Sequence, residues 1–572
     1  MKTLHAGWRT GAAALALGLA LAGPAFAGNR DREEMKEKWI AGDFHQHSYF
    51  TDGSNQIDKV MSNGYAFDLD FQANSEHGGL QGRDGYGRNW NDTGVYPTLP
   101  SIGDPTGGRM WRWQSLLRTS DIPGYAGPAY LGAYDWLLGI REDFPDKATM
   151  TGMEWNIPGH EHGSTGIARK NALPIAEFEY RFDQSDTDGT VTTVTADTMG
   201  WPGKRQNGEY TVAYPLLGLN PLHEKAIDGI KWMQKHYPRS GWIVPAHVER
   251  RGCGGVGNNG YTAAAFRDMN DNGPTVAFGF EGMPGHQKSV QRGEFGGSSC
   301  GGGTYGGAGI YVAQVGGLWD ALLGEGRGFY NFASSDFHGT GNDFWPGEYQ
   351  KTYVKAKVSG RHGEIRQEDV VAGLRSGNSF AVHGDLIEEL DFRVAPHSRH
   401  CGDDATMGET LKVRKGEKVE VKIRFKSPAA NNCRPGVNAS AGFNCQAYPP
   451  VVHHVQLIQG RFGNDRPAKF LADGSENPAF AENTNPTASI VKTFDAASWT
   501  VDRKGYATMT FVVPKMEANT YFRIRGTNKG YNEAGETDPN GSPLIDVPGN
   551  NSADEAWKDL WFYSNPIFVK VQ

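Results

Sequence analysis

From residue 38 to about residue 390, the chain alternates short apolar runs that read as β-strands with amphipathic runs that read as helices. The first apolar run covers residues 39–44. In the helical run after it, Ile57, Val60 and Met61 share one face, and Ser54 is the expected N-cap. A longer helix is expected over residues 223–237, and further strands are expected over residues 67–73, 148–154, 242–246, 275–280 and 329–333. Because helices between strands carry the chain back across a sheet, this order predicts an α/β fold with a parallel sheet closed into a barrel.

A different pattern begins after about residue 395, where strand-like runs follow one another without helices. Turn residues such as Lys415 and Gly416 separate these runs, which cover residues 411–425, 451–458, 507–513 and 520–525. We therefore expect a C-terminal β-sandwich domain over residues 395–572. It contains no obvious catalytic cluster, and a packing role is expected for it.

Three long segments interrupt the N-terminal alternation: residues 82–146, 168–220 and 251–309. Loops of this length within a compact domain are usually lids or binding loops, and surface decoration is the alternative. The first segment is rich in Trp, Tyr, Gly and Arg. This mix suits either helix packing, which is the commoner role, or the wall of a substrate pocket.

The first 27 residues have the features of a secretory signal peptide. Lys2 and Arg9 flank the start, an apolar stretch covers residues 12–22, and a small-residue Ala-Phe-Ala cleavage site covers residues 25–27. The apolar stretch is too short to span a bilayer, and no comparable stretch follows it. We expect a protein exported to the periplasm or the cell exterior, without a membrane span, whose first mature domain covers residues 28–390.

The charge balance argues against a nucleic-acid partner. The chain has a formal net charge of −8 at pH 7, and removal of the signal peptide takes away two positive charges and leaves about −10. No basic stripe remains that could neutralise phosphates along a nucleic acid.

The five cysteines are an odd number, which in an exported protein leaves at least one thiol outside any intramolecular pair. Cys253 and Cys300 lie in glycine-rich stretches, and Cys433 and Cys445 are twelve residues apart. We expect these two disulfides, with Cys401 unpaired. Thiolate binding of a metal is the alternative, but the chain contains no Cys-x-x-Cys sequence.

Histidine and carboxylate side chains stand at the ends of the expected strands. His45 and His47 follow the first strand as a His-x-His pair, whose side chains point to the same face and can bind one cation together. Asp52 follows on the next turn. Glu76 and His77 end the second strand, where a barrel places its catalytic groups.

The strand over residues 148–154 ends in Glu154, a carboxylate that could bridge two cations. Either His160 or His162 could complete the shell of ligands. We favour His162, because a short apolar run follows it directly.

Two further strands end in the same way. His247 follows the strand over residues 242–246, and Asp336 and His338 form a same-face pair after the strand over residues 329–333. A single such histidine is by default a buried structural residue. Five sites of this kind in order along the chain predict a multinuclear metal centre.

These motifs resemble those of the polymerase and histidinol phosphatase (PHP) family of metal-dependent phosphoesterases over residues 38–390. The matching residues are His45-Gln46-His47-Ser48, Asp52-Gly53, Glu76-His77, Glu154, His162, His247 and Asp336-Phe337-His338. Glu76 stands where the family usually has an aspartate that is not normally a ligand. The segment over residues 369–382 resembles the exported branch of the family, which carries a β domain behind the barrel.

The resemblance implies a distorted seven-stranded β/α barrel with up to three divalent cations at the carboxyl ends of its strands. The implied ligands are His45, His47, Glu154 and Asp336 for the first cation, Asp52, His77 and His338 for the second, and Glu154, His162 and His247 for the third.

A shell of carboxylates and imidazoles suits Mn²⁺, Zn²⁺ or Fe²⁺, and two or three such cations are expected in each chain. A hydroxide held between two cations can attack a phosphate ester. The predicted catalytic residues are His45, His47, Glu154, Asp336 and Arg250. Arg250 could clamp an anionic substrate, and so could its neighbour Arg251. The alternative for both arginines is an ion pair with surface carboxylates.

The sequence therefore predicts an exported metal-dependent phosphoesterase that hydrolyses phosphate mono- or diesters of small molecules. Two alternatives remain open at this point. The same site could hydrolyse carboxylic or carbamate esters, or the chain could be a non-catalytic metal-binding surface protein.

Overall fold

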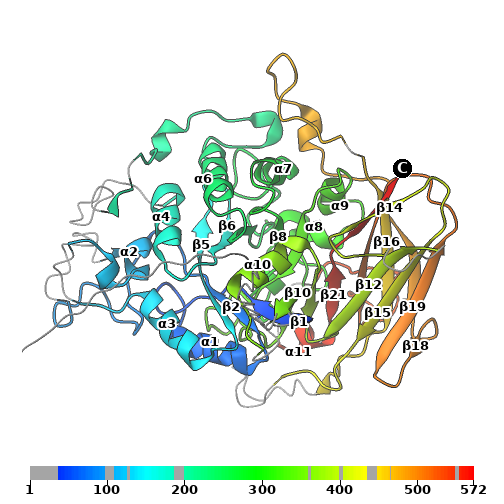
Figure 1. The fold of residues 1–572 in the computed structure, drawn as a ribbon, viewed down its shortest axis with the longest axis horizontal. Coiled ribbons are helices and arrows are strands. Elements are labelled where there is room, and N and C mark those ends of the chain that lie inside the picture. The colour runs from blue at the N-terminus through cyan, green and yellow to red at the C-terminus, as the bar shows by residue number, and fades with distance from the viewer. Residues whose placement is uncertain are drawn as a thin grey trace, which may run out of the picture.

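The structure is a computed structural model. It describes residues 36–96, 109–124, 129–185, 199–201, 203–358, 363–397, 404–433, 447–463, 465–547 and 553–572. Figure 1 shows most helices around the central strands on one side of the molecule, and long C-terminal strands on the other. The described residues form a mixed α/β fold with one thirteen-stranded sheet, one five-stranded sheet and two two-stranded sheets.

The N-terminal part contains strands and helices in alternation. Its strands are β1 (Lys36–Asp43), β2 (Phe71–Asn74), β3 (Leu80–Gln81), β4 (Met110–Trp111), β5 (Ala148–Asn156), β6 (His162–Ile167), β7 (Gly241–Pro245), β8 (Gly279–Met283), β9 (Tyr330–Ala333), β10 (Gln350–Val358) and β11 (Ser379–His383). Its α-helices are α1 (Ile57–Ala66), α2 (Arg112–Leu116), α3 (Ala133–Asp143), α4 (Leu173–Phe182), α6 (His223–His236), α7 (Ala263–Asn272), α8 (Ile310–Ala313), α9 (Leu318–Leu323) and α10 (Gln367–Ser376).

The central strands are only partly parallel, which corrects the expected all-parallel sheet. β1, β2 and β5 are parallel neighbours, but β6 is antiparallel to both β5 and β7, and β10 is antiparallel to β1. Residues 157–161 join β5 to β6, and a connection this short allows a hairpin but not the crossover that parallel neighbours need. The start of β6 therefore lies beside the end of β5.

β8 and β9 form a separate parallel pair. The Ile243 amide of β7 donates to the Val276 carbonyl just before β8 (2.7 Å), and the His47 amide after β1 donates to the Phe337 carbonyl after β9 (2.7 Å). Among the described residues, however, strand ladders do not join all of these neighbours. Closure into a seven-stranded barrel therefore stays a prediction.

Helix α1 buries the three residues expected on its inner face, Ile57, Val60 and Met61. Its N-cap is Gln56, which makes no side-chain capping bond, so the assignment of Ser54 as the cap is wrong. The Ser54 amide instead donates to the carbonyl of His338 (2.7 Å). This bond ties the loop before α1 to the loop after β9.

In the first long segment, the described residues around α2 pack into the core. Trp111, Arg112 and Trp113 are buried, and the guanidinium of Arg112 donates to the side-chain oxygen of Asn74 (2.7 Å). These contacts favour the packing role of this segment over the pocket wall.

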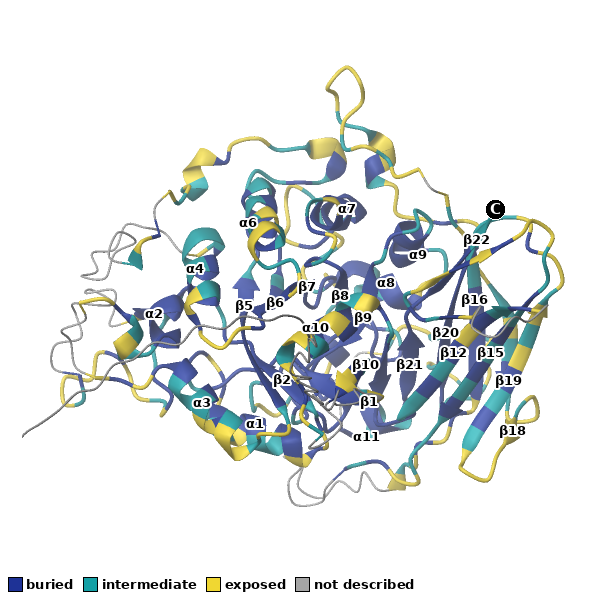
Figure 2. Ribbon diagram, viewed as in Figure 1, coloured by how far each residue is buried: buried dark blue, intermediate teal, exposed yellow. Residues whose placement is uncertain are grey.

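The C-terminal part contributes to two sheets. Its strands are β12 (Glu389–Pro396), β13 (Ala405–Thr406), β14 (Thr410–Val413), β15 (Val419–Lys426), β16 (His454–Arg461), β17 (Ser489–Asp495), β18 (Thr500–Val501), β19 (Tyr506–Val513), β20 (Thr520–Thr527), β21 (Trp561–Ser564) and β22 (Ile567–Val571). Strands β12, β13, β15, β18 and β19 form the five-stranded sheet. Every second residue of β15 is buried, which is typical of a strand with one face on a core (Figure 2).

The remaining C-terminal strands belong to the large sheet, because β21 pairs with β11 of the N-terminal part. The β-sandwich and its border near residue 395 stay predictions. The expectation of strands without helices is wrong, since α11 (Ala553–Lys558) precedes β21. Ala556 and Trp557 of this helix are buried, and the Trp557 ring packs edge-on against Tyr349 at 5.3 Å.

The signal peptide and two of the cysteines lie outside the described residues. None of the helices in the described ranges has the length and apolar character needed to cross a bilayer. The disulfide between Cys253 and Cys300 is confirmed. Cys433 is also in a disulfide, while Cys401 and Cys445 are not described.

Replacing both Cys253 and Cys300 by serine should lower the free energy of unfolding by about 2 to 4 kcal/mol, because the bond restricts the unfolded chain. The two cysteines are 47 residues apart, so the bond closes a long loop. Urea denaturation of the variant and the parent protein measures this difference. An unchanged midpoint and slope would contradict it.

Candidate metal centre

One buried carboxylate, Glu154, lies at the centre of five imidazole rings. Its side chain is 1% exposed. The nearest ring nitrogens lie 2.7 to 3.3 Å from its oxygens: His77 Nδ1 at 2.7 Å, His162 Nδ1 at 2.9 Å, His247 Nε2 at 3.0 Å, His45 Nε2 at 3.1 Å and His47 Nε2 at 3.3 Å.

The ends of neighbouring strands bring this cluster together. Its members come from one rim: His45 and His47 after β1, His77 after β2, Glu154 in β5, His162 at the start of β6, His247 after β7, and Asp336 and His338 after β9. His162 reaches the same rim from the beginning of its strand, because β6 runs antiparallel to β5.

Asp336 is the second carboxylate of the cluster. Its Oδ1 atom lies 3.2 Å from His45 Nε2 and 3.3 Å from His47 Nε2. With Glu154, these residues offer four ligand atoms that all lie within 4.8 Å of one another. They are the four residues implied for the first cation.

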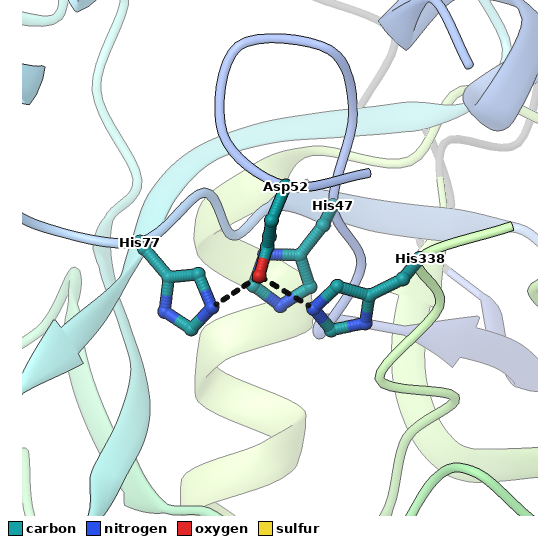
Figure 3. Close-up of side chains that lie close together, drawn as sticks. All are labelled: His47, Asp52, His77 and His338. Carbon is teal, nitrogen blue, oxygen red and sulfur yellow. Dashed lines mark ion pairs between the residues drawn. The ribbon is translucent and has the colours of Figure 1, made fainter. Parts of the chain in front are cut away.

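Asp52 forms a second group with three histidines, shown in Figure 3. Its Oδ2 atom lies 3.2 Å from His77 Nε2 and 3.4 Å from His338 Nε2. The rings of His47 and His338 stack with their centroids 4.0 Å apart. This group contains the three residues implied for the second cation, together with His47.

The third implied set is reproduced in part. Glu154 and His162 group with His77 rather than with His247. His247 nevertheless lies 3.0 Å from the same oxygen of Glu154 that His162 approaches. All nine predicted ligands therefore lie in one cluster.

The surroundings of His47 fit a cation. Burial lowers the pKa of His47, and His338 and His77 lower it further, to about 3, so the ring is neutral at pH 7. Its Nε2 atom lies 3.3 Å from oxygens of both Glu154 and Asp336 but has no hydrogen-bond partner among the described residues. A ring nitrogen and two carboxylates that face one another in this way are satisfied together by a cation between them.

The two central carboxylates are held ionised. Burial alone would raise the pKa of Glu154, but the charges of His162 and His77 bring it well below its ordinary value. Burial likewise opposes ionisation of Asp336, and His45 and His286 bring its pKa well below the usual range. Divalent cations require deprotonated carboxylate ligands, which this cluster provides at neutral pH.

Backbone strain is concentrated at this rim. His247, His286 and Asp336 have φ angles of 34°, 52° and 47°. Residues other than glycine rarely adopt positive φ, and such conformations persist where the surrounding structure imposes them, often at functional sites.

Two buried residues that the sequence reasoning missed support the cluster. Glu281, within β8, lies 3.0 Å from His45 Nδ1 and accepts a hydrogen bond from Ser164 (2.8 Å). His286 follows β8 by three residues, as Asp336 follows β9, so its place after a strand was the available signal.

His286 lies between two carboxylates. Its Nε2 atom is 3.0 Å from Asp336 Oδ2, and its Nδ1 atom is 2.5 Å from Asp343 Oδ1. Burial lowers its pKa, but Asp336 and Asp343 raise it to about 10. His286 thus holds Asp336 through Oδ2, while His45 and His47 face Oδ1.

Replacing His286 by asparagine should weaken binding of Mn²⁺ or Zn²⁺ by about 10- to 100-fold, the usual loss when a group that orients a ligand is removed. Competition with a chromogenic chelator measures the affinity. The exposed His236 at the end of α6 provides the control, since His236→Asn should leave the affinity unchanged. Equal affinities for the two variants would refute the role of His286.

The structure separates His160 from His162. His160 Nε2 lies 2.7 Å from His223 Nδ1, and its ring stacks on Tyr261, whereas His162 contacts Glu154. Glu76 accepts hydrogen bonds from the hydroxyls of Ser48 and Thr51 and so holds the loop after β1.

The two arginines take different places. Arg250 reaches the cluster, with Nη1 3.5 Å from Asp336 Oδ2 and Nη2 3.1 Å from His247 Nε2. Arg251 instead pairs with Glu161 (2.6 Å), which is the carboxylate pairing considered for it.

No protein-family model and no curated protein matches the chain. Among solved structures, the chain is similar to a two-domain protein from Bacteroides vulgatus ATCC 8482 that contains a predicted PHP-like metal-dependent phosphoesterase. The two share 11% sequence identity with a TM-score of 0.29, and the match covers 89% of this chain and 94% of that chain. A similarity this weak does not indicate a function. The function is inferred from the geometry of the cluster.

Proposed function

We propose that the chain is an exported metal-dependent phosphoesterase of the PHP type, which binds two or three divalent cations and hydrolyses phosphate mono- or diesters. The observation that carries the proposal is the convergence of five imidazoles on the buried carboxylate of Glu154. The closed barrel and the C-terminal β-sandwich belong to the same proposal.

The nine clustered residues would hold the cations. His45, His47, Glu154 and Asp336 would bind the first, Asp52, His77 and His338 the second, and Glu154, His162 and His247 the third. Such cations activate water and stabilise negative charge on the oxygens of an ester.

The cluster has a closed side and an open side. The side chains of His45, His47 and Glu154 are at most 1% exposed, whereas Asp52 is 55% exposed and His162 is 25% exposed. A substrate would therefore approach over Asp52 and His162, while the closed side keeps water from the buried ligands.

Arg250 favours an anionic substrate. Its side chain is 16% exposed, and its guanidinium lies beside Asp336 and His247. A guanidinium in this position can donate two hydrogen bonds to phosphate oxygens. An uncharged carboxylic ester has no negative charge with which this guanidinium could pair.

Export is proposed from residues 1–27 and is supported by the disulfide between Cys253 and Cys300, since such bonds persist in oxidising compartments.

The function can be tested with the purified protein loaded with Mn²⁺ or Zn²⁺. We expect turnover of p-nitrophenyl phosphate, bis-p-nitrophenyl phosphate or both. Turnover of p-nitrophenyl acetate alone would replace the phosphoesterase by a carboxylic-ester hydrolase. Bound cations without turnover of any of the three would indicate a non-catalytic metal-binding protein.

A further inference from the structure

A polar pocket lies beside the metal centre and shares His162 with it. The pocket has a volume of about 510 Å³, which is within the range of small-molecule sites. His162 Nδ1 contacts Glu154 in the cluster (2.9 Å), and the same residue lines the pocket. A group bound in the pocket would adjoin an ester bound at the cations.

Two of the segments that build the pocket are loops that follow strands and are bonded to each other, and a third, with Gln184 and Ser185, follows α4. The Glu161 amide, after β5, donates to the Asn259 carbonyl, after β7 (2.7 Å). The Tyr261 hydroxyl bonds the carbonyls of Glu161 (2.7 Å) and His162 (3.0 Å). The disulfide of Cys253 anchors the second loop. These two walls are therefore held in place before any ligand binds, which lowers the entropic cost of binding.

Most of the residues that line the pocket have polar side chains. Asn156, Gln184, Asn258 and Asn259 contribute side-chain amides, and the described lining contains no aliphatic side chain and no Phe, Tyr or Trp. Most small-molecule pockets are lined mainly by apolar side chains. A lining of this kind instead suits a ligand that is covered with hydrogen-bonding groups, because each of them loses water on binding and needs a partner.

The charges of the pocket cancel. Arg251 pairs with Glu161 at 2.6 Å, so its guanidinium already has a carboxylate partner. The pocket therefore offers little attraction to a second phosphate. Its described lining contains no Phe, Tyr or Trp on which a nucleobase could stack, and its two imidazoles are engaged elsewhere, His160 with Tyr261 and His162 with Glu154. The ligand that fits best is uncharged.

Two amides are available to such a ligand. The Gln184 side-chain oxygen accepts the Gly159 amide (2.8 Å), which leaves its NH₂ group for other partners. Within the described part of the chain, the Asn259 side chain makes no hydrogen bond, and this residue is exposed.

We infer that this pocket binds an uncharged, hydroxyl-rich leaving group, so that the substrate is the phosphate ester of a sugar or polyol. The ester half of this inference rests on the proposed phosphoesterase function. The alcohol half rests on the lining of the pocket.

Kinetics of an Asn259→Leu variant test the inference, because leucine keeps the size of the side chain and removes its amide. The ratio of kcat/KM for glucose 6-phosphate to kcat/KM for phenyl phosphate should fall about tenfold, the effect of one lost hydrogen bond. The control is Asn483→Leu, an exposed asparagine outside the pocket, which should leave the ratio unchanged. An unchanged ratio in Asn259→Leu, or a parent enzyme that prefers phenyl phosphate, would overturn the inference.

Saturation-transfer NMR with glucose and phenol as probes separates this inference from the proposed function, because it requires no turnover. Glucose should receive saturation from the parent protein and from Asn483→Leu, and much less from Asn259→Leu. Transfer to phenol but not to glucose would contradict the inference. Glucose binding by a protein that hydrolyses no phosphate ester would support the pocket assignment and reject the phosphoesterase.

Discussion

Replacing Glu154 by glutamine should reduce hydrolysis of p-nitrophenyl phosphate by about 1,000-fold and should also reduce the amount of bound metal. Glutamine has nearly the same shape as glutamate, but it lacks the negative charge that two cations can share. Both oxygens of Glu154 face imidazoles of the cluster, so the substitution removes a charge that five rings share. Steady-state kinetics and metal analysis of the same preparation measure the two effects.

Glu348→Gln is the matched control for this prediction. Glu348 is buried like Glu154, but it is not among the residues of the cluster. Burial raises its pKa to about 7, so a neutral amide resembles the protonated form that it already adopts in part. The control should keep its metal and its activity. Equal losses in both variants would show that a buried glutamine damages the fold, and full activity in Glu154→Gln would contradict the bridging role.

Replacing Asp320 by asparagine should lower the free energy of unfolding by about 3 to 5 kcal/mol, the usual cost of removing one partner of a buried ion pair. Asp320 lies in α9 and is fully buried. Its oxygens accept hydrogen bonds from Arg523 Nε (2.9 Å) and Nη2 (2.7 Å) and from the Tyr521 hydroxyl (3.0 Å), and both partners lie on β20. The variant would leave the Arg523 guanidinium buried without its counter-charge.

This ion pair joins the N-terminal part to the C-terminal strands, so we expect one unfolding transition to move as a whole to lower urea concentration. The control is Asp502→Asn, which removes an exposed partner of Arg424 and should leave the midpoint nearly unchanged. Two separate transitions, of which only one moves, would contradict the expectation that both parts unfold together.

The positions of the candidate ligands were predictable because each depends on short-range sequence. His45 and His47 are two residues apart at the end of an apolar run, and Asp336 and His338 repeat this spacing. The choice of His162 over His160 followed from the apolar run that became β6. Residues two apart in a strand point to the same face, so this local spacing predicts directly which side chains lie together.

Other features depend on contacts that local sequence does not encode. The strand expected over residues 275–280 is β8, which runs from Gly279 to Met283. Because the expected strand ended too early, Glu281 fell outside it and His286 did not stand close behind a strand end. The antiparallel place of β6 has a different reason, because residues 162–167 were not among the expected strands and the hairpin with β5 therefore had no second strand. The pairing of β11 with β21 joins strands about 180 residues apart, for which no local signal exists.

The central claim is that residues distant in the sequence bind shared cations around Glu154. Anomalous X-ray diffraction from crystals of Mn²⁺- or Zn²⁺-loaded protein tests it most directly, because it locates the cations without any assumption about the substrate. We predict two or three anomalous peaks within bonding distance of the clustered histidines and carboxylates, with Glu154 between two of them. Fully loaded crystals with no peak at the cluster, or with peaks only on the molecular surface, would contradict the account.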